Sequence, residues 1–331
     1  MIVFNLVCKS CQFEFEGCFD NSKDYEKQLR KNFINCPNCN SSSIKKFLMS
    51  PNLSKKSNAK KPIQNKKTVI NNIKKYKKII EKIKFSLSRG DSYQINFTQP
   101  KKYKLFTNPF DAYLSMRKII KPWHGMYINS SSLKVLSFTP EKFFKTSNGR
   151  IKSIPMKGTR PRANDLINDE LLKSELQNSK KDKAEHLMIV DLIRNDVGKI
   201  SKFGTVKTKN LFQVQSYKTV HQMVSEISGE LIDDIKEFDI LNALFPGGSI
   251  TGAPKESAMK IIDRLENYNR NIYTGTIGYI KNNSDMNFNI PIRTMCVKNN
   301  IGNYSVGGGI VWDSIPEKEC EEAQLKSAIL N

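Results

Sequence analysis

The sequence predicts an α+β protein that begins with a small cysteine-rich module. Three observations support this organisation. Two Cys-x-x-Cys pairs lie within residues 1–50, a polar and lysine-rich stretch fills residues 51–67, and the remainder mixes helix-like apolar spacing with strands joined by hairpin signals. A chain of 331 residues can bury a substantial core. We therefore expect a module over residues 1–50, a flexible basic linker over residues 51–67 and one large domain over residues 68–331.

The cysteine pairs have the spacing of a structural zinc site. Cys8 and Cys11 flank Lys-Ser, and Cys36 and Cys39 flank Pro-Asn. Two such pairs can place four thiolates tetrahedrally around Zn²⁺, and their tight turns point backbone N–H groups at sulfur. The alternative is four unrelated cysteines, and Cys18 is a spare thiol between the pairs. The pattern predicts a structural zinc module that resembles a zinc ribbon.

The chain is strongly basic, with 54 Lys and Arg against 32 Asp and Glu and a formal net charge of +22. Such a balance can indicate binding to nucleic acid or to an anionic membrane. Lysine greatly outnumbers arginine, however, asparagine is abundant, and residues 54–84 hold a dense share of the excess, which indicates a drift of composition. We expect no nucleic-acid partner. No apolar run of about 18 residues could span a membrane, and residues 1–7 are too short for a signal peptide, so we expect a cytoplasmic protein.

Local patterns predict the first elements of the large domain. Apolar spacing favours helices at 69–87 and 110–120, ended by Gly90 and by Lys121-Pro122, and alternation favours strands at 92–98 and 134–138. Strands at 143–146 and 150–154 flank Asn148-Gly149, the strongest short hairpin signal.

Lys157 follows this hairpin, between an apolar run and a Gly-Thr turn, and Glu141 precedes it. A lysine at the end of a buried strand must stay neutral, find a partner or meet an anionic ligand. The alternative is an ordinary exposed lysine in a lysine-rich chain. Because the ribbon carries Glu141 near one base and Lys157 near the other, the two are candidates for an acid catalyst and an amine nucleophile.

The segment 179–198 reads as a buried helix with Gly198 at its C′ position, and Asp182 and Glu185 share a face at its start. These acids fit either a metal site or complementation of the helix dipole. His221 follows in a strand-like segment, where a lone histidine is more often a core residue than a ligand.

The glycine-rich segment 245–256 leads into a helix whose first turn contains Pro254. A glycine-rich entry to a helix N-terminus can bind an anion. The pattern lacks the Gly-Lys-Ser/Thr of a nucleotide-binding loop, so we expect a carboxylate ligand.

Three strands are expected at 272–280, 288–297 and 303–311, with Arg293 in the second and three glycines, Gly307, Gly308 and Gly309, in the third. Consecutive glycines weaken a strand, which indicates close approach of a ligand or backbone. Ser314 to Glu317 reads as a capping box for the last helix. There Glu319 and Glu322 repeat the acidic spacing, and two acidic pairs on two helices suit Mg²⁺.

Residues from about 90 to 330 resemble the chorismate-utilising enzymes, which include component I of anthranilate synthase and of aminodeoxychorismate synthase and the isochorismate and salicylate synthases. The stretches that carry the resemblance are GDSYQINFTQ, FTPEKFF, IPMKGTRPR, KDKAEHLMIVDLIRNDVG, FPGGSITGAPKESAMKIIDRLE, IYTGTIGYI, IPIRTM and GGGIVWDSIPEKECEEAQLK. The resemblance implies an α+β core of two packed, mainly antiparallel sheets flanked by helices, with chorismate and Mg²⁺ between them.

The resemblance also implies roles for individual residues. Glu185 and Glu322 would bind Mg²⁺, with Asp182 and Glu319 contacting it directly or through water. The substrate carboxylates would be held by a second group, which consists of Arg293, Tyr273, Thr251 and the backbone of Gly307, Gly308 and Gly309. His221 and Thr159 would line the substrate ring.

Two positions distinguish members of the family. Isochorismate-type members have a lysine base where this chain has Gln94, which argues against water as nucleophile. Anthranilate-forming members resemble Pro-Ile-Ala-Gly-Thr where this chain has Pro155-Met-Lys-Gly-Thr159. A lysine there is the mark of aminodeoxychorismate synthase, in which it attacks the substrate, so Lys157 would be the nucleophile and Glu141 the acid.

The resemblance further implies where the ammonia comes from and which product the enzyme releases. The chain lacks a Gly-x-Cys-x-Gly glutaminase motif, so we expect a glutamine amidotransferase partner, and it lacks an appended lyase region, so we expect aminodeoxychorismate as product, for 4-aminobenzoate and folate synthesis. The module and linker stand where many members have a tryptophan-binding region, so tryptophan control is not expected. Anthranilate synthase component I remains the alternative activity, and a nucleic-acid-binding zinc ribbon with a vestigial enzyme core is the alternative class.

Overall fold

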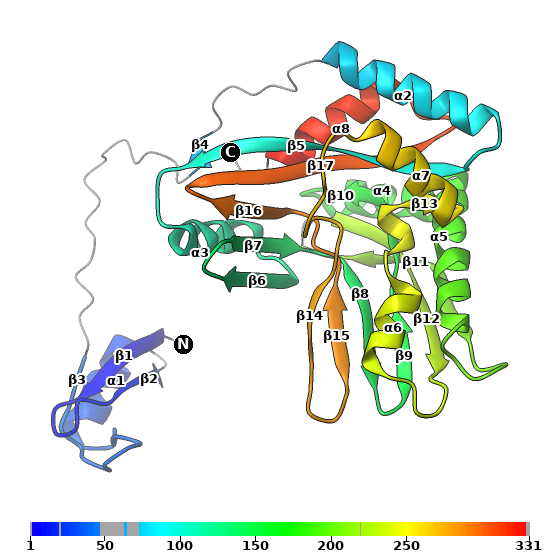
Figure 1. Ribbon diagram of the computed structural model, residues 1–331. Helices are drawn as coiled ribbons and strands as arrows, with labels where there is room; N and C mark the ends of the chain where they lie inside the picture. Colours follow the sequence, from blue (N-terminus) through cyan, green and yellow to red (C-terminus); the bar gives the residue numbers. More distant parts are fainter. Residues whose placement is uncertain (1, 20, 47–62, 65–72, 219, 329–331) are drawn as a thin grey trace. The chain divides into compact units, whose positions relative to one another are not determined.

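The computed structural model describes residues 2–19, 21–46, 63–64, 73–218 and 220–328 (Figure 1). The chain divides into two compact units, residues 1–59 and residues 60–331. Most of the predicted linker therefore lies outside the described residues. The exception is Ile63–Gln64, which forms a short strand, β4, against the large sheet that contains β5.

Unit 1 is a three-stranded antiparallel sheet in the order β2-β1-β3, with one helix. Its elements are β1 (Ile2–Cys8), β2 (Glu14–Phe19), α1 (Ser22–Arg30) and β3 (Ile44–Lys46). The Asn21 side chain accepts a hydrogen bond from the N–H of Asp24, which caps α1.

Unit 2 contains two seven-stranded sheets in which every pairing is antiparallel. The first has the order β13-β5-β17-β16-β7-β6, with β4 also on β5. Its members are β5 (Gln94–Leu105), β6 (His124–Asn129), β7 (Lys134–Thr139), β13 (Gly252–Ala253), β16 (Thr294–Lys298) and β17 (Ile301–Val311). The long pairing of β5 with β17 forms its centre.

The second sheet has the order β10-β12-β9-β8-β15-β14, with β11 on the free edge of β12. Its members are β8 (Lys142–Ser147), β9 (Arg150–Ser153), β10 (Met156–Pro161), β11 (Lys207–Ser216), β12 (Val220–Glu230), β14 (Ile277–Ile280) and β15 (Met286–Asn289). Ser147 pairs with Arg150, so Asn148-Gly149 forms the predicted two-residue hairpin turn.

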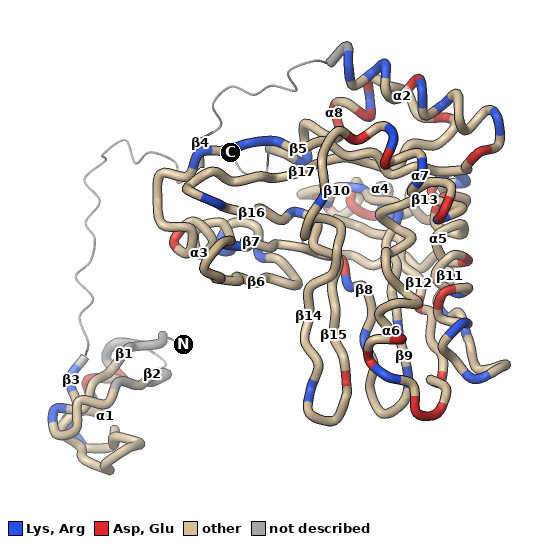
Figure 2. Tube along the Cα trace, in the orientation of Figure 1, with Lys and Arg blue, Asp and Glu red and all other residues tan. Residues whose placement is uncertain are grey.

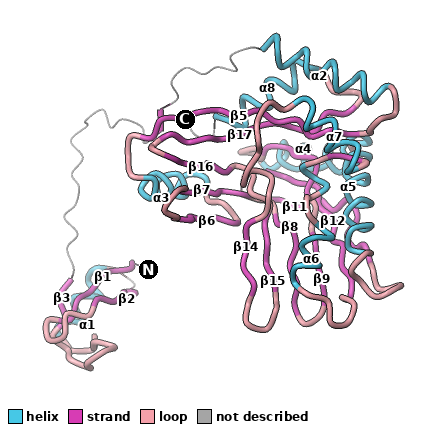
Figure 3. Tube along the Cα trace, in the orientation of Figure 1, coloured by secondary structure: helices cyan, strands magenta, loops and turns pink. Residues whose placement is uncertain are grey.

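Helices cover both sheets (Figures 1 and 3). They are α2 (Ile73–Ser88), α3 (Pro109–Ile120), α4 (Leu166–Asn178), α5 (Lys180–Gly198), α6 (Glu237–Leu244), the short 3-10 helix η1 (Gly248–Ile250), α7 (Lys255–Leu265) and α8 (Pro316–Ala328). The helices α2, α3, α7 and α8 pack on the first sheet, and α5 and α6 pack on the second. The expected α+β architecture of antiparallel sheets flanked by helices is confirmed.

Two of the chain's crossings between the sheets are neighbours. Thr139 ends β7 and Lys142 begins β8, while Asn289 ends β15 and Thr294 begins β16. The N–H of Ile290 donates to the carbonyl of Glu141 at 3.1 Å, which joins the two crossings. Functional side chains at these crossings therefore lie at the junction of the sheets.

Several predicted elements differ from the structure. The strand expected at 288–297 is two strands in different sheets, because Pro291 lacks the N–H for a ladder and Arg293 adopts a left-handed backbone with φ of 50°. The strand expected at 272–280 begins only at Ile277. The strand expected at 92–98 extends to Leu105. Residues 69–72 of the first expected helix lie outside the described residues.

Two expected helix boundaries are also wrong in detail. Gly198 belongs to α5 and is not a left-handed residue beyond it. The Ser314 hydroxyl accepts from the N–H of Val311 and donates to Glu319 at 2.7 Å, and Glu317 pairs with Lys77, so the expected capping box is replaced by other contacts.

Charged residues are distributed over both units, and lysines recur along α2 (Figure 2). None of the described helices is both long enough and apolar enough to cross a membrane.

Candidate active site

A cavity of about 580 Å³ in unit 2 brings together most of the candidate residues. Its walls come from β5, β10, β17, α5, α8, η1 and the two crossings between the sheets. Of the predicted catalytic, substrate-binding and Mg²⁺-binding residues, these line it: Glu141, Lys157, Thr159, Asp182, Glu185, Tyr273, Arg293, Gly307, Gly308, Gly309, Glu319 and Glu322. Such a concave, polar-lined site is the expected form of a small-molecule site.

Lys157 and Glu141 are linked through one residue. The Lys157 ammonium donates to the backbone carbonyl of Ser249 at 3.1 Å, and the Ser249 hydroxyl donates to Oε1 of Glu141 at 2.6 Å. Within the described part of the chain the amine and the carboxylate form no direct ion pair. The cavity therefore holds the amine and the carboxyl group close together, joined through Ser249 and not through each other.

Burial sets the protonation of this pair. Burial lowers the pKa of Lys157, an effect that the Glu141 charge opposes and the Lys326 charge reinforces. Burial raises the pKa of Glu141, opposed by the Lys157 charge and by the hydrogen bond from Ser249. Both shifts favour the neutral forms, which are a nucleophilic amine and a proton-donating acid.

Two acidic pairs face the cavity from two helices, Asp182 and Glu185 on α5 and Glu319 and Glu322 on α8. Burial raises the pKa of Glu185, and the Asp182 and Glu319 charges act in the same direction. Burial also raises the pKa of Glu319, with the Glu322 charge again adding to it. Mutual repulsion of this kind is relieved by a cation.

Three of these acids pair with cations of the protein. Asp182 accepts from Arg160 at 3.1 Å, Glu185 pairs with Lys181 at 3.8 Å, and Glu322 pairs with Lys326 at 2.6 Å. Among the described residues, the cysteine cluster of unit 1 is the one group of metal-binding side chains whose ligand atoms all lie within 4.8 Å of one another. The four acids are thus neighbours on one cavity and do not form an equally tight cluster.

The lining also contains groups suited to an anion. Arg293 is exposed and, among the described residues, has no ion-pair partner, and its left-handed backbone lies at the second crossing between the sheets. Tyr273 is 8% exposed, and burial raises the pKa of its phenol. An unpaired guanidinium and a protonated phenol in the lining of one cavity are suited to a carboxylate.

Glycine occupies the three successive positions of β17 for different structural reasons. A Cβ at Gly307 would lie 2.0 Å from the carbonyl oxygen of Phe97 on β5, and one at Gly309 would lie 2.2 Å from the Gln94 amide. A Cβ at Gly308 would instead meet Glu319 and Glu322 at 3.5 and 3.7 Å. The expected close approach of backbone is confirmed at Gly307, whereas Gly309 lies against the Gln94 side chain and Gly308 faces the acids.

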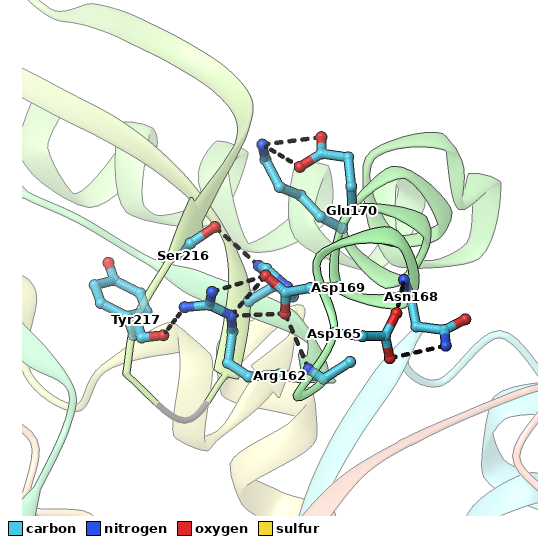
Figure 4. Close-up of polar contacts among 10 residues, drawn as sticks. Arg162, Asp165, Asn168, Asp169, Glu170, Ser216 and Tyr217 are labelled. Carbon is cyan, nitrogen blue, oxygen red and sulfur yellow. Dashed lines mark hydrogen bonds and ion pairs between the residues drawn. The ribbon is translucent and has the colours of Figure 1, made fainter.

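The structure does not place His221, which was expected to line the substrate ring, among the residues that line the cavity. The imidazole is fully buried outside the cavity, with Nε2 at 2.9 Å from Asp169 and Nδ1 at 2.9 Å from Ser216. Arg162 in turn clamps Asp169, and Figure 4 shows Ser216, Asp169 and Arg162 converging. His221 is a satisfied core residue, and its neighbour Gln222 lines the cavity instead.

Thr251 is likewise outside the cavity lining, against prediction. Its hydroxyl donates to the carbonyls of Gly247 and Gly248, so it closes its own turn. The glycine-rich segment around it forms η1 and β13 before α7 begins, and Ser249 and Ile250 of this segment reach the cavity.

Several cavity residues were not identified by sequence reasoning. Ser249 connects the two candidate catalytic groups, and Lys326 donates to the carbonyl of Gly307 at 2.9 Å while pairing with Glu322. Only Lys326 has a sequence signal, four residues after Glu322 on one helix. Gln94, named as a discriminating position, lines the cavity, and its side-chain oxygen is buried with no hydrogen-bond partner among the residues that the structure describes.

The four cysteines of unit 1 come together as the spacing predicts. The Sγ atoms of Cys8 and Cys39 lie 3.5 Å apart, and those of Cys11 and Cys36 lie 3.6 Å apart. Cys296 and Cys320 lie in unit 2 and are absent from the cavity lining.

Comparisons with known proteins agree with this geometry. A family model for chorismate binding enzymes matches residues 11–331. Aminodeoxychorismate synthase component 1 of Salmonella typhimurium is 42% identical over 236 residues, which are 71% of this chain and 52% of that protein. Anthranilate synthase component 1 of Acetivibrio thermocellus is 38% identical over 269 residues, which are 81% of this chain and 54% of that protein.

The fold has solved counterparts. The crystal structure of anthranilate synthase component I from Streptococcus pneumoniae superposes with a TM-score of 0.74 at 28% identity, covering 93% of this chain and 65% of that one. The chain thus spans about half the length of the sequence relatives described above. Its fold, its cavity and the match over residues 11–331 lead to one conclusion: the chain belongs to the chorismate-binding enzyme family.

Proposed function

We propose that this chain is component I of an aminodeoxychorismate synthase, which converts chorismate and ammonia to 4-amino-4-deoxychorismate for 4-aminobenzoate and folate synthesis. The observation that carries the proposal is the pairing of Lys157 with Glu141 through Ser249 in one cavity. Relatives named aminodeoxychorismate synthase component 1, from Salmonella typhimurium and Escherichia coli, support it at 42% and 41% identity.

The chemistry follows from the protonation of the pair. The neutral Lys157 amine attacks C2 of chorismate, both ring double bonds shift, and the C4 hydroxyl leaves as water with a proton from Glu141. Ammonia then adds at C4, both double bonds shift back, and the lysine leaves C2 as the free amine. The ammonium formed at C4 returns a proton to Glu141. Chorismate and ammonia give the product and one water. General acid assistance of this kind contributes about 10²- to 10⁴-fold.

The acidic pairs would hold Mg²⁺. The donor set consists of carboxylate oxygens, which a hard cation prefers. Burial, with a smaller contribution from neighbouring carboxylates, raises the pKa values of Glu185 and Glu319, and a bound cation would offset both effects. Glu185 and Glu322 would be ligands, with Asp182 and Glu319 in contact or joined through water. When bound, the ion would neutralise a substrate carboxylate beside these acids.

The remaining lining residues would orient the substrate. Arg293 and Tyr273 offer donors to one carboxylate, and the backbone of residues 307–309 passes beside the acids that would hold the other. Thr159, on the strand that carries Lys157, would contact the ring.

Ammonia would come from a glutamine amidotransferase partner. The relatives' names describe component 1 of their synthases. Within the described part of unit 2, the cysteines Cys296 and Cys320 lie outside the cavity lining, so no thiol there is placed to hydrolyse glutamine.

Anthranilate synthase component I is the second candidate, favoured by the relative that covers 81% of the chain. In that reaction ammonia itself would attack C2, and Lys157 would have no covalent role.

The product distinguishes the two. The full chain is incubated with chorismate, Mg²⁺ and an ammonium salt, and the product is identified by mass and fluorescence. We expect aminodeoxychorismate from the wild type and from Lys145→Ala, an exposed lysine on the neighbouring hairpin, and loss of product from Lys157→Ala. Anthranilate from the wild type, or no turnover, would overturn the proposal.

A further inference from the structure

The thiol cluster belongs to unit 1, and none of its cysteines is among the residues that line the cavity of unit 2. Its four Sγ atoms, from Cys8, Cys11, Cys36 and Cys39, all lie within 4.8 Å of one another. A tetrahedral site with Zn–S bonds of about 2.3 Å places its sulfurs at comparable mutual distances. The geometry alone is compatible with a metal site or with two disulfides.

The backbone around the cysteines decides between these. Each pair is built on the same loop. In the first, the N–H of Gln12 donates to the carbonyl of Cys8, and the N–H of Cys8 donates to the carbonyl of Phe13. In the second, Asn40 donates to Cys36, and Cys36 donates to Ser41.

The two cysteine loops also match in their backbone angles and in their hydrogen bonds to sulfur. The fifth residue of each loop is left-handed, with φ of 60° at Gln12 and 56° at Asn40. The N–H two residues after the first cysteine points at its sulfur, from Ser10 to Cys8 and from Asn38 to Cys36, each at 3.4 Å. Such N–H donors stabilise thiolate rather than thiol, because a thiolate is the stronger acceptor.

Further contacts form a second layer. The hydroxyls of Ser10 and Ser41 lie 2.9 Å apart and join the two loops, and the Asn38 amide lies 3.7 Å from the sulfur of Cys11. Metal sites are characteristically oriented by such outer contacts.

The core of unit 1 depends on this cluster. Its buried members are Leu6, Cys8, Tyr25, Ile34, Cys36 and Ile44, so two of the six are themselves sulfur ligands. A unit of this size is marginally stable without a disulfide or a metal. Because a preformed site rarely exists in the unfolded chain, the free energy of metal binding becomes free energy of folding.

We propose that unit 1 binds one Zn²⁺ through Cys8, Cys11, Cys36 and Cys39, and that this ion folds unit 1 while unit 2 folds without it. Sulfur-only tetrahedral sites select zinc or iron, and zinc is the ion without redox chemistry that closed structural sites hold. The proposal concerns unit 1 alone and stands independently of the activity assigned to unit 2.

The first test is metal content of the full chain, purified without added metal and analysed by elemental mass spectrometry. We expect one zinc per chain in the wild type and in Cys296→Ser, the matched loss of a thiol from unit 2. Cys36→Ser should weaken zinc binding by more than about 100-fold, since even loss of an outer contact costs about 10- to 100-fold. Asn38→Ala, which removes an outer contact, should weaken zinc binding by only about 10- to 100-fold. Iron in place of zinc would overturn the assignment.

The second test is hydrogen exchange of the full chain, with and without a zinc chelator. Exchange in residues 2–46 should rise on chelation and return on adding zinc, while exchange in residues 94–328 stays unchanged. Protection of residues 2–46 that survives chelation, together with disulfides joining Cys8 to Cys39 and Cys11 to Cys36 by peptide mapping, would overturn the proposal.

Discussion

At the scale of single residues, Glu141 affects Lys157 in two opposed ways. Its negative charge raises the lysine pKa, and burial lowers that pKa by more. At both groups burial is the largest cause of the pKa shift, so each shift favours the neutral form. Ser249 bridges the two groups, which form no direct ion pair within the described part of the chain.

Glu141→Gln tests this balance directly. Removing the negative charge should lower the pKa of Lys157 further, and removing the acid should lower kcat by about 10²- to 10⁴-fold. The pKa is measured from the pH dependence of Lys157 acylation, followed by peptide mass spectrometry. Glu226→Gln, which removes an acid paired with Lys152, should leave the midpoint in place. A midpoint that moves upward in Glu141→Gln contradicts the account.

Residue-level predictions succeeded where the signal was local. Lys157 and Glu141 stand at the two bases of one hairpin, so the sequence predicts their proximity. His221 illustrates the opposite case. Its segment predicts a strand, but the partner that occupies its Nε2, Asp169, comes from α4, a helix that sequence reasoning did not find. Ser249 carries no sequence signal at all.

At the scale of elements, α5 and α8 each present two acids to the cavity. Saturating Mg²⁺, at about 100 times its Kd, should stabilise unit 2 by about 2.7 kcal/mol. Glu185→Gln and Glu322→Gln should abolish the rise in Tm, while Glu256→Gln, an exposed acid on α7 paired with Lys260, should retain it. Equal Tm shifts in the wild type and all three variants would show that Mg²⁺ does not bind at these helices.

The same acids predict the pH dependence of this effect. The folded-state pKa values of Glu185 and Glu319 are raised, so the folded chain binds more protons than the unfolded one. Without Mg²⁺, stability therefore falls as pH rises from the ordinary glutamate pKa through the raised one. Mg²⁺ relieves the repulsion, so the Mg²⁺-induced rise in Tm, measured by thermal scans, should grow across that window. A shift that shrinks with pH is the contrary result.

The strand β17 allows a matched test of its glycines. Gly307→Ala places a Cβ against a carbonyl of β5 and should cost about 1–3 kcal/mol or more, which lowers Tm. Gly308→Ala meets only ordinary contacts and should keep Tm near wild type while raising KM, because its methyl group occupies the space before Glu319 and Glu322. A large loss of Tm in Gly308→Ala would contradict this assignment.

The ends of strands were predictable where the sequence contains residues that favour a tight turn. Asn148-Gly149 fixes one hairpin, and Asn299 and Asn300, both left-handed, fix another. The strand expected at 288–297 failed because both halves have strand-like composition, and only tertiary structure shows that they belong to different sheets. The helices α4 and α6 and the strands β6 and β11 lack a clear apolar period of their own.

At the scale of the whole molecule, the two-sheet arrangement could not come from periodicity, since it depends on chain crossings at Glu141 and Arg293. Resemblance to the family supplied it, and the structure confirms it. Unit 1 shows the reverse, because four cysteines were enough to predict their cluster.

The division of labour between this chain and a partner is also testable at this scale. The chain alone should form product with ammonium and none with glutamine, because no thiol of unit 2 within the described residues lines the cavity. Product formation is followed at fixed pH with each nitrogen source. Glutamine-dependent product from the purified chain alone would contradict the need for an amidotransferase.

The central claim is that Lys157 becomes covalently attached to the substrate, and trapping it is the most direct measurement. The full chain is incubated with chorismate and Mg²⁺ without ammonia, quenched and analysed by peptide mass spectrometry. The account predicts an added mass of chorismate less one water on Lys157, absent in Lys157→Ala and removed by ammonium. An unmodified Lys157, with Lys157→Ala forming aminodeoxychorismate at the wild-type rate, would contradict it.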